Sequence, residues 1–395
     1  MNKGAPLQET DDEQYSITER SYDAVVIGGG IAGASLAYEL AADRRVTLVE
    51  AEGALGYHAT GRSATMFLES YGGPDVRALT IGGRAFLEQP PEGFSRPLMT
   101  PRPFIQFAVP GRGERLRELY VELGGSKSAL ELIDAAQIRS ACPYACPEFF
   151  ADVALCEHHS QELDANALLQ GFIAGFRARG GTVLKNAQVT GLRRVQELWR
   201  VDTVRGPLSA ALVVNAAGAW ADEVAQVAGL VPLGLTPRRR TAFTIDSEGF
   251  SATDGEPGPL LYDIDETFYM KPEGAQLLCS PADRTPCEPY DAKPDDLEIA
   301  RALELIRAAT TLQARSVRTS WAGLRTFSPD GNLVVGADPR IDGFFWAAGQ
   351  GGYGIQTAPS VARMAAAMIR DEAIPADLVE LGVSAERLSP VRFHS

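Results

Sequence analysis

One stretch near the start of the chain limits the fold more than any other. Residues 22–50 run through an apolar segment, the pattern GGGIAG at 28–33, an Ala- and Leu-rich segment and a second apolar segment. This order predicts strand, glycine turn, helix and strand, a unit that binds a dinucleotide at the helix N-terminus. Gly28 allows a tight turn, Gly30 lets backbone approach a pyrophosphate, and Gly33 lets the helix pack on the strand.

An acidic residue completes this unit. Glu50 ends the second apolar segment, where a carboxylate can accept hydrogen bonds from ribose hydroxyls. An acid at this position argues against a 2′-phosphate and leaves FAD or NAD. A glycine turn without a cofactor is the alternative, but strand, helix and acid all stand where a dinucleotide needs them. The glycine spacing recurs at 349–354, but the complete unit of strand, glycine turn, helix, strand and acid does not occur a second time, which disfavours enzymes that bind FAD and NAD in two such folds.

Size and charge limit the organisation and the partners of the chain. At 395 residues it exceeds a typical single domain, so two connected domains are expected. The net charge of −14 disfavours nucleic acid and anionic membranes, because phosphate contacts need clustered Lys and Arg. No run approaches the roughly 18 apolar residues of a membrane-spanning helix, so no transmembrane segment is expected.

The N-terminus and the cysteines favour a cytoplasmic location. Residues 1–20 are polar and acidic, which predicts a disordered leader rather than a signal peptide. The five cysteines are odd in number and scattered, as expected in a reducing compartment. The Cys and His residues that lie near one another match no zinc spacing, so no metal is predicted; they are Cys142, Cys146, Cys156, His158 and His159.

Two kinds of hydrophobic pattern in the sequence predict two interleaved domains. Helical periodicity marks 164–179 and 354–370, and short apolar runs predict buried strands at 182–184 and 344–348. Alternating apolar residues within 237–315 instead predict an antiparallel sheet. The predicted boundaries are 1–20 for the leader, 21–98, 153–236 and 318–375 for the nucleotide domain, 99–152 and 237–317 for the cap domain, and 376–395 for a C-terminal tail.

Four further segments carry a family resemblance: GYHATGRSA at 56–64, VNAAGAW at 214–220, WAGLR at 321–325 and GQGGYGIQT at 349–357. Together with the dinucleotide unit they resemble the FAD-dependent D-amino acid dehydrogenase and glycine oxidase (DAO) superfamily, and within it most closely bacterial D-arginine dehydrogenase. The resemblance implies FAD, and because no Cys or His stands at a recognised covalent attachment motif, the FAD is expected to be non-covalent. The resemblance also implies an α/β fold of the D-amino acid oxidase/glycine oxidase type, in which a Rossmann-like FAD-binding domain carries a substrate (cap) domain with a mixed β-sheet.

The glycine-rich segments have a physical role beside a flavin. Small residues at 61–64 let backbone amides approach the pyrophosphate, where Arg62 could neutralise charge. The 349–354 loop precedes a helix whose dipole stabilises negative charge on reduced flavin. Segment 215–220 permits flavin packing, although an ordinary strand-to-helix corner is the alternative. Val189 is an adenine contact by resemblance only. The predicted cofactor contacts are Gly28, Gly30, Ile31, Ala32, Gly33, Glu50, Ala51, Gly61, Arg62, Ser63, Ala64, Val189, Ala217, Gly218, Trp220, Gly349, Gly351, Gly352, Tyr353, Gly354, Ile355 and Gln356.

The substrate site needs a clamp for a carboxylate. Arg240 and Arg325 are the candidates, since a guanidinium matches a carboxylate bidentately; the neighbouring Arg238 and Arg239 fit a solvated turn. By resemblance Tyr71 and Tyr269 line the site, with an ordinary core position as the alternative. The predicted catalytic residues are Arg240, Arg325, Tyr269, Tyr71 and Gly352, and the predicted pocket residues are Met66, Leu68 and Tyr262.

Differences from D-arginine dehydrogenase indicate the substrate specificity. D-arginine dehydrogenase has a glutamate for the guanidinium shortly before its Pro-Arg-Pro, whereas here 101–103 is preceded by 93–97, which contains no acid. Met66 stands in place of a histidine and Leu68 in place of a threonine. The pocket is therefore expected to be more apolar, although Glu69 or Glu266 could supply a negative charge.

We expect oxidative deamination of a D-amino acid with a neutral or apolar side chain. Hydride transfer to flavin N5 gives an imine that water hydrolyses to a 2-oxo acid and ammonia, with no protein base required. The electron acceptor is oxygen or a quinone-like molecule. The alternative enzyme is a secondary-amine or glycine oxidase that acts on an N-methyl or cyclic amino acid and releases hydrogen peroxide. A flavin-binding protein without amine chemistry is the alternative of another class.

Overall fold

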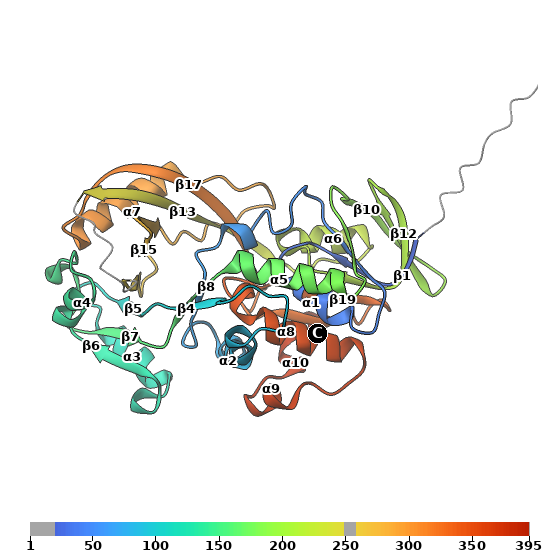
Figure 1. Ribbon diagram of the computed structural model, residues 1–395, viewed down its shortest axis with the longest axis horizontal. Coiled ribbons are helices and arrows are strands. Elements are labelled where there is room, and N and C mark those ends of the chain that lie inside the picture. Colours follow the sequence, from blue (N-terminus) through green and yellow to red (C-terminus); the bar gives the residue numbers. More distant parts are fainter. Residues whose placement is uncertain (1–19, 249–257, 395) are drawn as a thin grey trace, which may run out of the picture.

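The computed structural model describes residues 20–248 and 258–394, so the predicted leader lies outside the described residues except for Arg20. Two eight-stranded sheets form two lobes that lie side by side (Figure 1). A small third sheet lies near the junction of the lobes, in the order β3 (Met66–Phe67), β8 (Gln161–Leu163), β4 (Met99–Pro101).

The first sheet contains the dinucleotide unit and confirms its predicted order. Its parallel centre runs β12 (Gly206–Asn215), β1 (Arg20–Ile27), β2 (Val46–Val49) and β9 (Thr182–Leu184). The hairpin strands β10 (Val189–Val195) and β11 (Leu198–Thr203) extend it beyond β12, and β19 (Phe344–Ala348) with β18 (Val334–Ala337) also joins at β12.

Helices cover both faces of the first sheet because β1 is apolar on both faces. Ala24 and Val26 pack toward α1 (Ile31–Leu40), α5 (Ala165–Ala178) and α8 (Gly354–Ile369). Val25 and Ile27 pack toward α6 (Ala221–Val227) on the other face. α1 packs against α5 and α8, and α2 (Pro74–Glu88) packs against α8. Such two-sided burial is typical of a parallel sheet.

The second sheet is mixed, as the resemblance implied. Its order is β17 (Gln313–Phe327), β13 (Thr236–Glu248), β16 (Gln276–Ser280), β15 (Tyr269–Glu273), β14 (Leu260–Asp263), β5 (Phe104–Phe107), β7 (Ala154–Glu157) and β6 (Leu130–Ile133). Among the strand pairs that the described residues form in this sheet, only β14–β5 is parallel. The strand β7 lies in this sheet, although the predicted boundary at 153 placed it in the nucleotide domain.

Alternation along β13 gives the two faces of the second sheet different roles. Phe243 and Ile245 pack toward α7 (Asp296–Ala309) and α4 (Ala135–Ala141), while α3 (Glu114–Glu122) packs near β6 and β7. Arg240 and Ala242 point the other way, toward a cavity. A strand places neighbouring side chains on opposite faces, so one strand serves both core and cavity.

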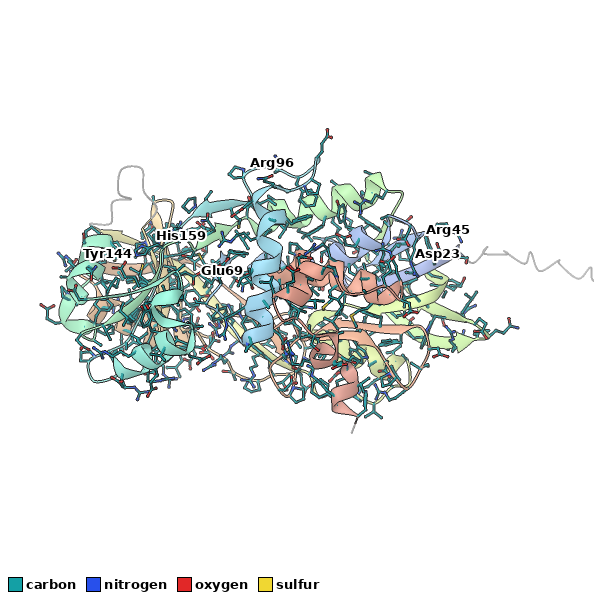
Figure 2. The ribbon with its side chains drawn as sticks, turned by 90° about the horizontal axis from the view of Figure 1, so that it is seen from below. Asp23, Arg45, Glu69, Arg96, Tyr144 and His159 are labelled. Carbon is teal, nitrogen blue, oxygen red and sulfur yellow. The ribbon has the colours of Figure 1, made fainter. Side chains whose placement is uncertain are left out.

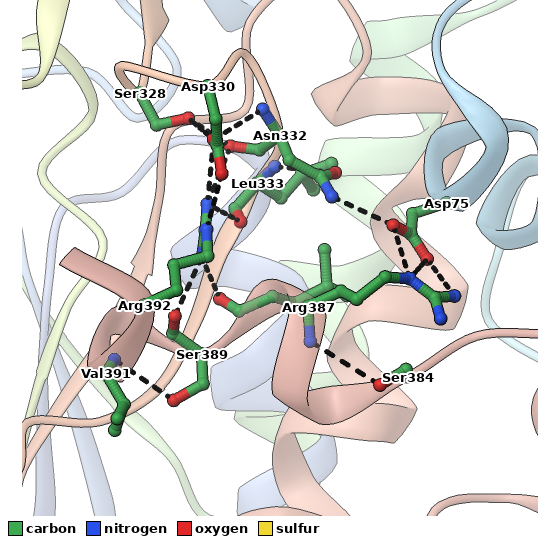
Figure 3. Close-up of polar contacts among 11 residues, drawn as sticks. Asp75, Ser328, Asp330, Asn332, Leu333, Ser384, Arg387, Ser389, Val391 and Arg392 are labelled. Atoms are coloured by element: carbon green, nitrogen blue, oxygen red, sulfur yellow. Dashed lines mark hydrogen bonds and ion pairs between the residues drawn. The ribbon is translucent and has the colours of Figure 1, made fainter. Parts of the chain in front are cut away.

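The predicted C-terminal tail is docked on the first lobe (Figure 3). Residues 376–395 contain α9 (Ala376–Glu380) and α10 (Ala385–Leu388). Arg387 pairs with Asp75 at 2.6 Å, and Arg392 pairs with Asp330 at 2.7 Å. These ion pairs fix the end of the chain beside α2 and the turn before β18.

Candidate active site

One cavity of about 570 Å³ extends from the glycine turn of the first sheet to the inner face of the second. At one end it is lined by Gly28, Gly30 and Glu50, and at the other by Arg240 and Arg325. Its volume lies in the range of small-molecule and cofactor sites.

Gly28 and Gly33 of the dinucleotide unit occupy positions that no side chain could share. Gly28 has φ +110°, and a Cβ there would lie 2.3 Å from the carbonyl oxygen of Ala216. A Cβ on Gly33 would lie 2.0 Å from the carbonyl oxygen of Gly28, so α1 can pack on β1 only through a glycine. Gly30 lines the cavity directly in front of α1, where helix amides favour a phosphate.

Glu50 lines this end of the cavity and also organises the glycine turn. Its Oε2 accepts a hydrogen bond from the Gly29 amide at 2.7 Å, and its Oε1 accepts one from the Glu52 amide at 2.8 Å. The carboxylate is therefore held in one orientation beside the cavity. Thr60 also holds the glycine turn, because its hydroxyl accepts a hydrogen bond from the Ile31 amide at 3.0 Å. This residue was not identified from the sequence.

Most of the predicted cofactor contacts line the cavity. Gly33, Gly61, Gly349 and Tyr353 do not line it. Those that do are Gly28, Gly30, Ile31, Ala32, Glu50, Ala51, Arg62, Ser63, Ala64, Val189, Ala217, Gly218, Trp220, Gly351, Gly352, Gly354, Ile355 and Gln356.

The role expected for Arg62 is not supported by its contacts. Its Nη2 donates to Asp291 Oδ1 at 2.6 Å, and its Nη1 donates to the carbonyl oxygens of Ala292 and Ala322 at 3.2 and 2.9 Å. The guanidinium charge is thus already paired. Arg62 thus ties the turn before β3 to β17, and because it also lines the cavity, its place at the pyrophosphate stays a prediction.

At the other end of the cavity, Arg325 lies beside Gly352 and Tyr71. A Cβ on Gly352 would lie 3.1 Å from Arg325 Nη1 and 3.5 Å from the Tyr71 hydroxyl. Within the described part of the chain, no hydrogen bond or ion pair engages the Arg325 guanidinium. Because Arg325 lines the cavity, its unpaired guanidinium can donate to a ligand there.

Arg240 reaches the same cavity from β13 with part of its charge balanced. Its Nη2 lies 3.6 Å from Glu266 Oε2, while its Nε and Nη1 are buried and have no hydrogen-bond partner among the described residues. Arg239 points to the opposite face and pairs with Asp283 and Asp295 at 3.1 and 2.7 Å. The prediction that Arg238 and Arg239 lie in a solvated turn is wrong, because both lie within β13 and are half-buried.

Aromatic and apolar side chains close the cavity around these arginines. Tyr262 stacks on Tyr269 with ring centroids 5.8 Å apart, and its buried hydroxyl has no partner within the described ranges. Burial, together with nearby Tyr71 and Glu266, raises the pKa of Tyr262 well above its ordinary value. The phenol therefore stays protonated and can donate a hydrogen bond. The apolar lining also includes Met66, Leu68, Phe104 and Leu260.

The two candidate acids lie in different environments. Glu69 does not line the cavity; it pairs with Arg84 of α2 at 2.7 Å, between the lobes (Figure 2). Glu266 lies within 4 Å of both Arg240 and Arg284, so two arginines share its charge. The loop at 93–97 also lies outside the cavity lining, with Phe94 buried in the first core and Arg96 at the edge of the molecule (Figure 2).

No group of three or more His, Cys, Asp or Glu side chains in the described ranges could hold a metal ion. The helices of residues 20–248 and 258–394 include none with both the length and the apolar character needed to cross a membrane.

Comparison with known proteins gives a consistent result. The sequence profile of the DAO family, described as FAD dependent oxidoreductase, matches residues 23–368. Glycine oxidase of Bacillus licheniformis is 25% identical, over 94% of this chain and 99% of the relative. The structure of L-proline dehydrogenase from P. horikoshii superimposes with a TM-score of 0.80 at 19% identity, covering 95% of this chain and 98% of that one. The structure of glycine oxidase from Geobacillus kaustophilus superimposes with a TM-score of 0.79 at 20% identity, covering 92% of this chain and 99% of that one.

These matches confirm the predicted α/β fold, FAD as the cofactor and oxidation as the reaction class. The glycine turn, the small residues that line the cavity and the open arginine end fit a bound FAD next to a substrate. A particular closeness to D-arginine dehydrogenase and a preference for D-amino acids stay predictions.

Proposed function

This chain belongs to the DAO family of FAD-dependent oxidoreductases and acts on amino acid or amine C–N groups, and we propose that its substrate is a D-amino acid with a neutral or apolar side chain. The products are a 2-oxo acid and ammonia. The observation that carries this proposal is the Arg325 guanidinium, which lies open to the cavity beside Gly352 and Tyr71.

The polar groups of the site suit an α-carboxylate. Arg325 presents a planar set of donors, and a bidentate guanidinium–carboxylate pair fixes orientation as well as position. The Tyr71 hydroxyl lies near the same point, Arg240 adds positive charge at this end of the cavity, and the neutral Tyr262 phenol adds an unpaired hydrogen-bond donor. A carboxylate here would hold the adjoining carbon in one place, which is the main requirement for a hydride transfer.

In this proposal, the apolar wall of the cavity determines which substrate side chain binds. Met66, Leu68 and Phe104 offer surface to an apolar group, which gains roughly 25 cal/mol for each Å² buried. A basic side chain would need an acid, and Glu266 is already shared between Arg240 and Arg284. An unpaired buried charge loses its hydration without compensation.

Bound FAD would supply the acceptor for the hydride that leaves the α-carbon. The protein orients the substrate through Arg325, and the protonated phenol of Tyr262 donates a hydrogen bond rather than removing a proton. The amine must be neutral at the moment of transfer, and the resulting imine is hydrolysed by water. The 2-oxo acid and ammonia, measured in equal amounts from one D-amino acid, test this reaction.

A secondary-amine or glycine oxidase is the second candidate, supported by the similarity to glycine oxidase and L-proline dehydrogenase. N-methylglycine, glycine and D-proline compared with D-alanine would separate the two. Hydrogen peroxide in air, compared with turnover by a quinone-like dye, distinguishes oxidase from dehydrogenase. A cytoplasmic location also stays a proposal, supported by five cysteines that are all free.

A further inference from the structure

Residues 68–71, here called the Tyr71 segment, form part of the substrate end of the cavity without belonging to a helix or strand. Leu68 and Tyr71 line the cavity, and Glu69 and Ser70 form a turn between them. Backbone groups outside regular structure still need hydrogen-bond partners when they are buried. The Tyr71 amide donates to the Leu68 carbonyl at 3.4 Å, and further partners come from side chains distant in sequence.

Two buried side chains bind the backbone of the Tyr71 segment. Gln356 of α8 accepts from the Leu68 amide at 3.2 Å and donates to the Leu68 carbonyl at 3.4 Å. Glu157, at the end of β7, accepts from the Glu69 amide at 2.9 Å and from the Ser70 amide at 3.3 Å, and the Ser70 hydroxyl donates to it as well. The segment is thus held by one residue from each lobe.

Glu157 is an unusual residue for this position. It is only 4% exposed, and no ion pair reaches its carboxylate within residues 20–248 and 258–394. Burial raises its pKa, and the hydrogen bonds from Ser70 and from the backbone amides oppose that rise. A buried carboxylate is costly unless its acceptors are used. Here the Tyr71 segment uses both oxygens.

We propose that Glu157 is a positioning residue for the substrate site: its carboxylate fixes the backbone at Glu69 and Ser70 and thereby holds Tyr71 beside Arg325 and Gly352. The role as a substrate-positioning group rests on the proposed function. Glu157 does not line the cavity, so it acts through Tyr71. The Tyr71 ring also makes edge contacts with Tyr353 and Tyr262, with centroids 5.2 and 6.3 Å away, and packs against the apolar cluster of the cavity wall.

Glu157→Gln tests this role with little change of shape. The amide replaces one acceptor oxygen by an NH₂ group, which faces a backbone N–H or the Ser70 hydroxyl. We expect KM for D-alanine to rise about tenfold, the scale of a lost charge-assisted hydrogen bond, with FAD content and kcat changed less than about twofold. Glu131→Gln, the same change on the neighbouring strand β6, is the control and should match the wild type.

A double-mutant cycle separates positioning from general loosening. Because Glu157 acts through Tyr71, Tyr71→Phe and the double variant should share nearly the same KM, so the two effects should not add. Additive effects, or an unchanged KM in Glu157→Gln, would overturn the proposal.

Hydrogen exchange of the backbone amides tests the inference without a measurement of turnover. The amides of Glu69 and Ser70 should exchange at least about tenfold faster in Glu157→Gln than in the wild type or Glu131→Gln, since both donate to the Glu157 carboxylate and one of its acceptor oxygens is lost. Equal exchange overturns the proposal even if no substrate has been found. Wild-type protein that oxidises no amine would instead refute the proposed function, whatever the exchange rates are.

Discussion

The Arg325 guanidinium lies against the backbone of Gly352, with Nη1 3.1 Å from the point that a Cβ on Gly352 would occupy. The contact brings together strand β17 of the second sheet and the glycine loop before α8 of the first. Because the loop residue lacks a side chain, space remains for a ligand at the arginine.

Gly352→Ala should fill this space. Its Cβ would meet Arg325 and, at 3.5 Å, the Tyr71 hydroxyl, so the substrate carboxylate and the methyl group would compete. We expect at least about a tenfold loss of kcat/KM with FAD retained. Gly73→Ala is the control, because a Cβ there has no neighbour within 4 Å. Wild-type kinetics in Gly352→Ala would place the substrate elsewhere in the cavity.

Arg325→Met should abolish substrate-linked flavin reduction without loss of FAD. A charge-assisted bidentate contact contributes on the order of 1.5 to 3 kcal/mol, hence at least about tenfold in kcat/KM. Stopped-flow reduction with D-alanine measures the effect. Arg193→Met, a change at an exposed arginine paired with Asp202 in the first sheet, serves as the control. Equal efficiency of Arg325→Met and the wild type on all substrates would exclude this clamp.

Gly30→Asp should yield protein without FAD. The new carboxylate would stand at the cavity end in front of α1, where it would repel the pyrophosphate, and its Cβ would already lie 3.3 Å from Thr60 Oγ1. Visible absorbance per mole of protein measures the loss. Gly73→Asp, the same change before α2, should keep its FAD. Stoichiometric flavin in Gly30→Asp would refute the role assigned to this turn.

Asp330→Asn should destabilise the docked C-terminal tail in a pH-dependent way (Figure 3). Burial alone would raise the pKa of Asp330, but hydrogen bonds from Arg392, Ser328 and the Asn332 amide bring it to about 2. Since the folded pKa is below the unfolded value, the stabilisation is complete above that unfolded value and is lost as pH falls toward 2. The Tm gap between wild type and Asp330→Asn should therefore be present at neutral pH and shrink as the pH falls from about 4 toward 2. Asp342→Asn is the control, and a constant gap would contradict this account.

The sequence predicted what local patterns determine. The strand, glycine turn and helix of residues 22–40 follow from steric demands within one segment, so the roles of Gly28 and Gly33 can be inferred from the sequence alone. Arg325 and Tyr71 could be named only through family resemblance, and their approach to Gly352 depends on the packing of two lobes.

Contacts between distant segments explain what the sequence analysis missed. Arg62 was expected at a phosphate because nothing near it in sequence reveals Asp291, its partner in the fold. Glu157 lies 87 residues from Ser70, so no periodic pattern links them. Arg239 was assigned to a turn because three consecutive arginines look solvated, whereas Asp283 and Asp295 neutralise it within β13.

Anaerobic mixing of the FAD-loaded protein with single amino acids tests the central claim most directly. The cavity predicts that neutral or apolar D-amino acids bleach the flavin fastest, D-arginine and D-lysine more slowly, and the L-isomers least. L-isomers are disfavoured because their hydrogen points away from the flavin when carboxylate and side chain are held. D-arginine as the fastest substrate would refute the apolar pocket, and a flavin that no amine or amino acid reduces would contradict the proposed function itself.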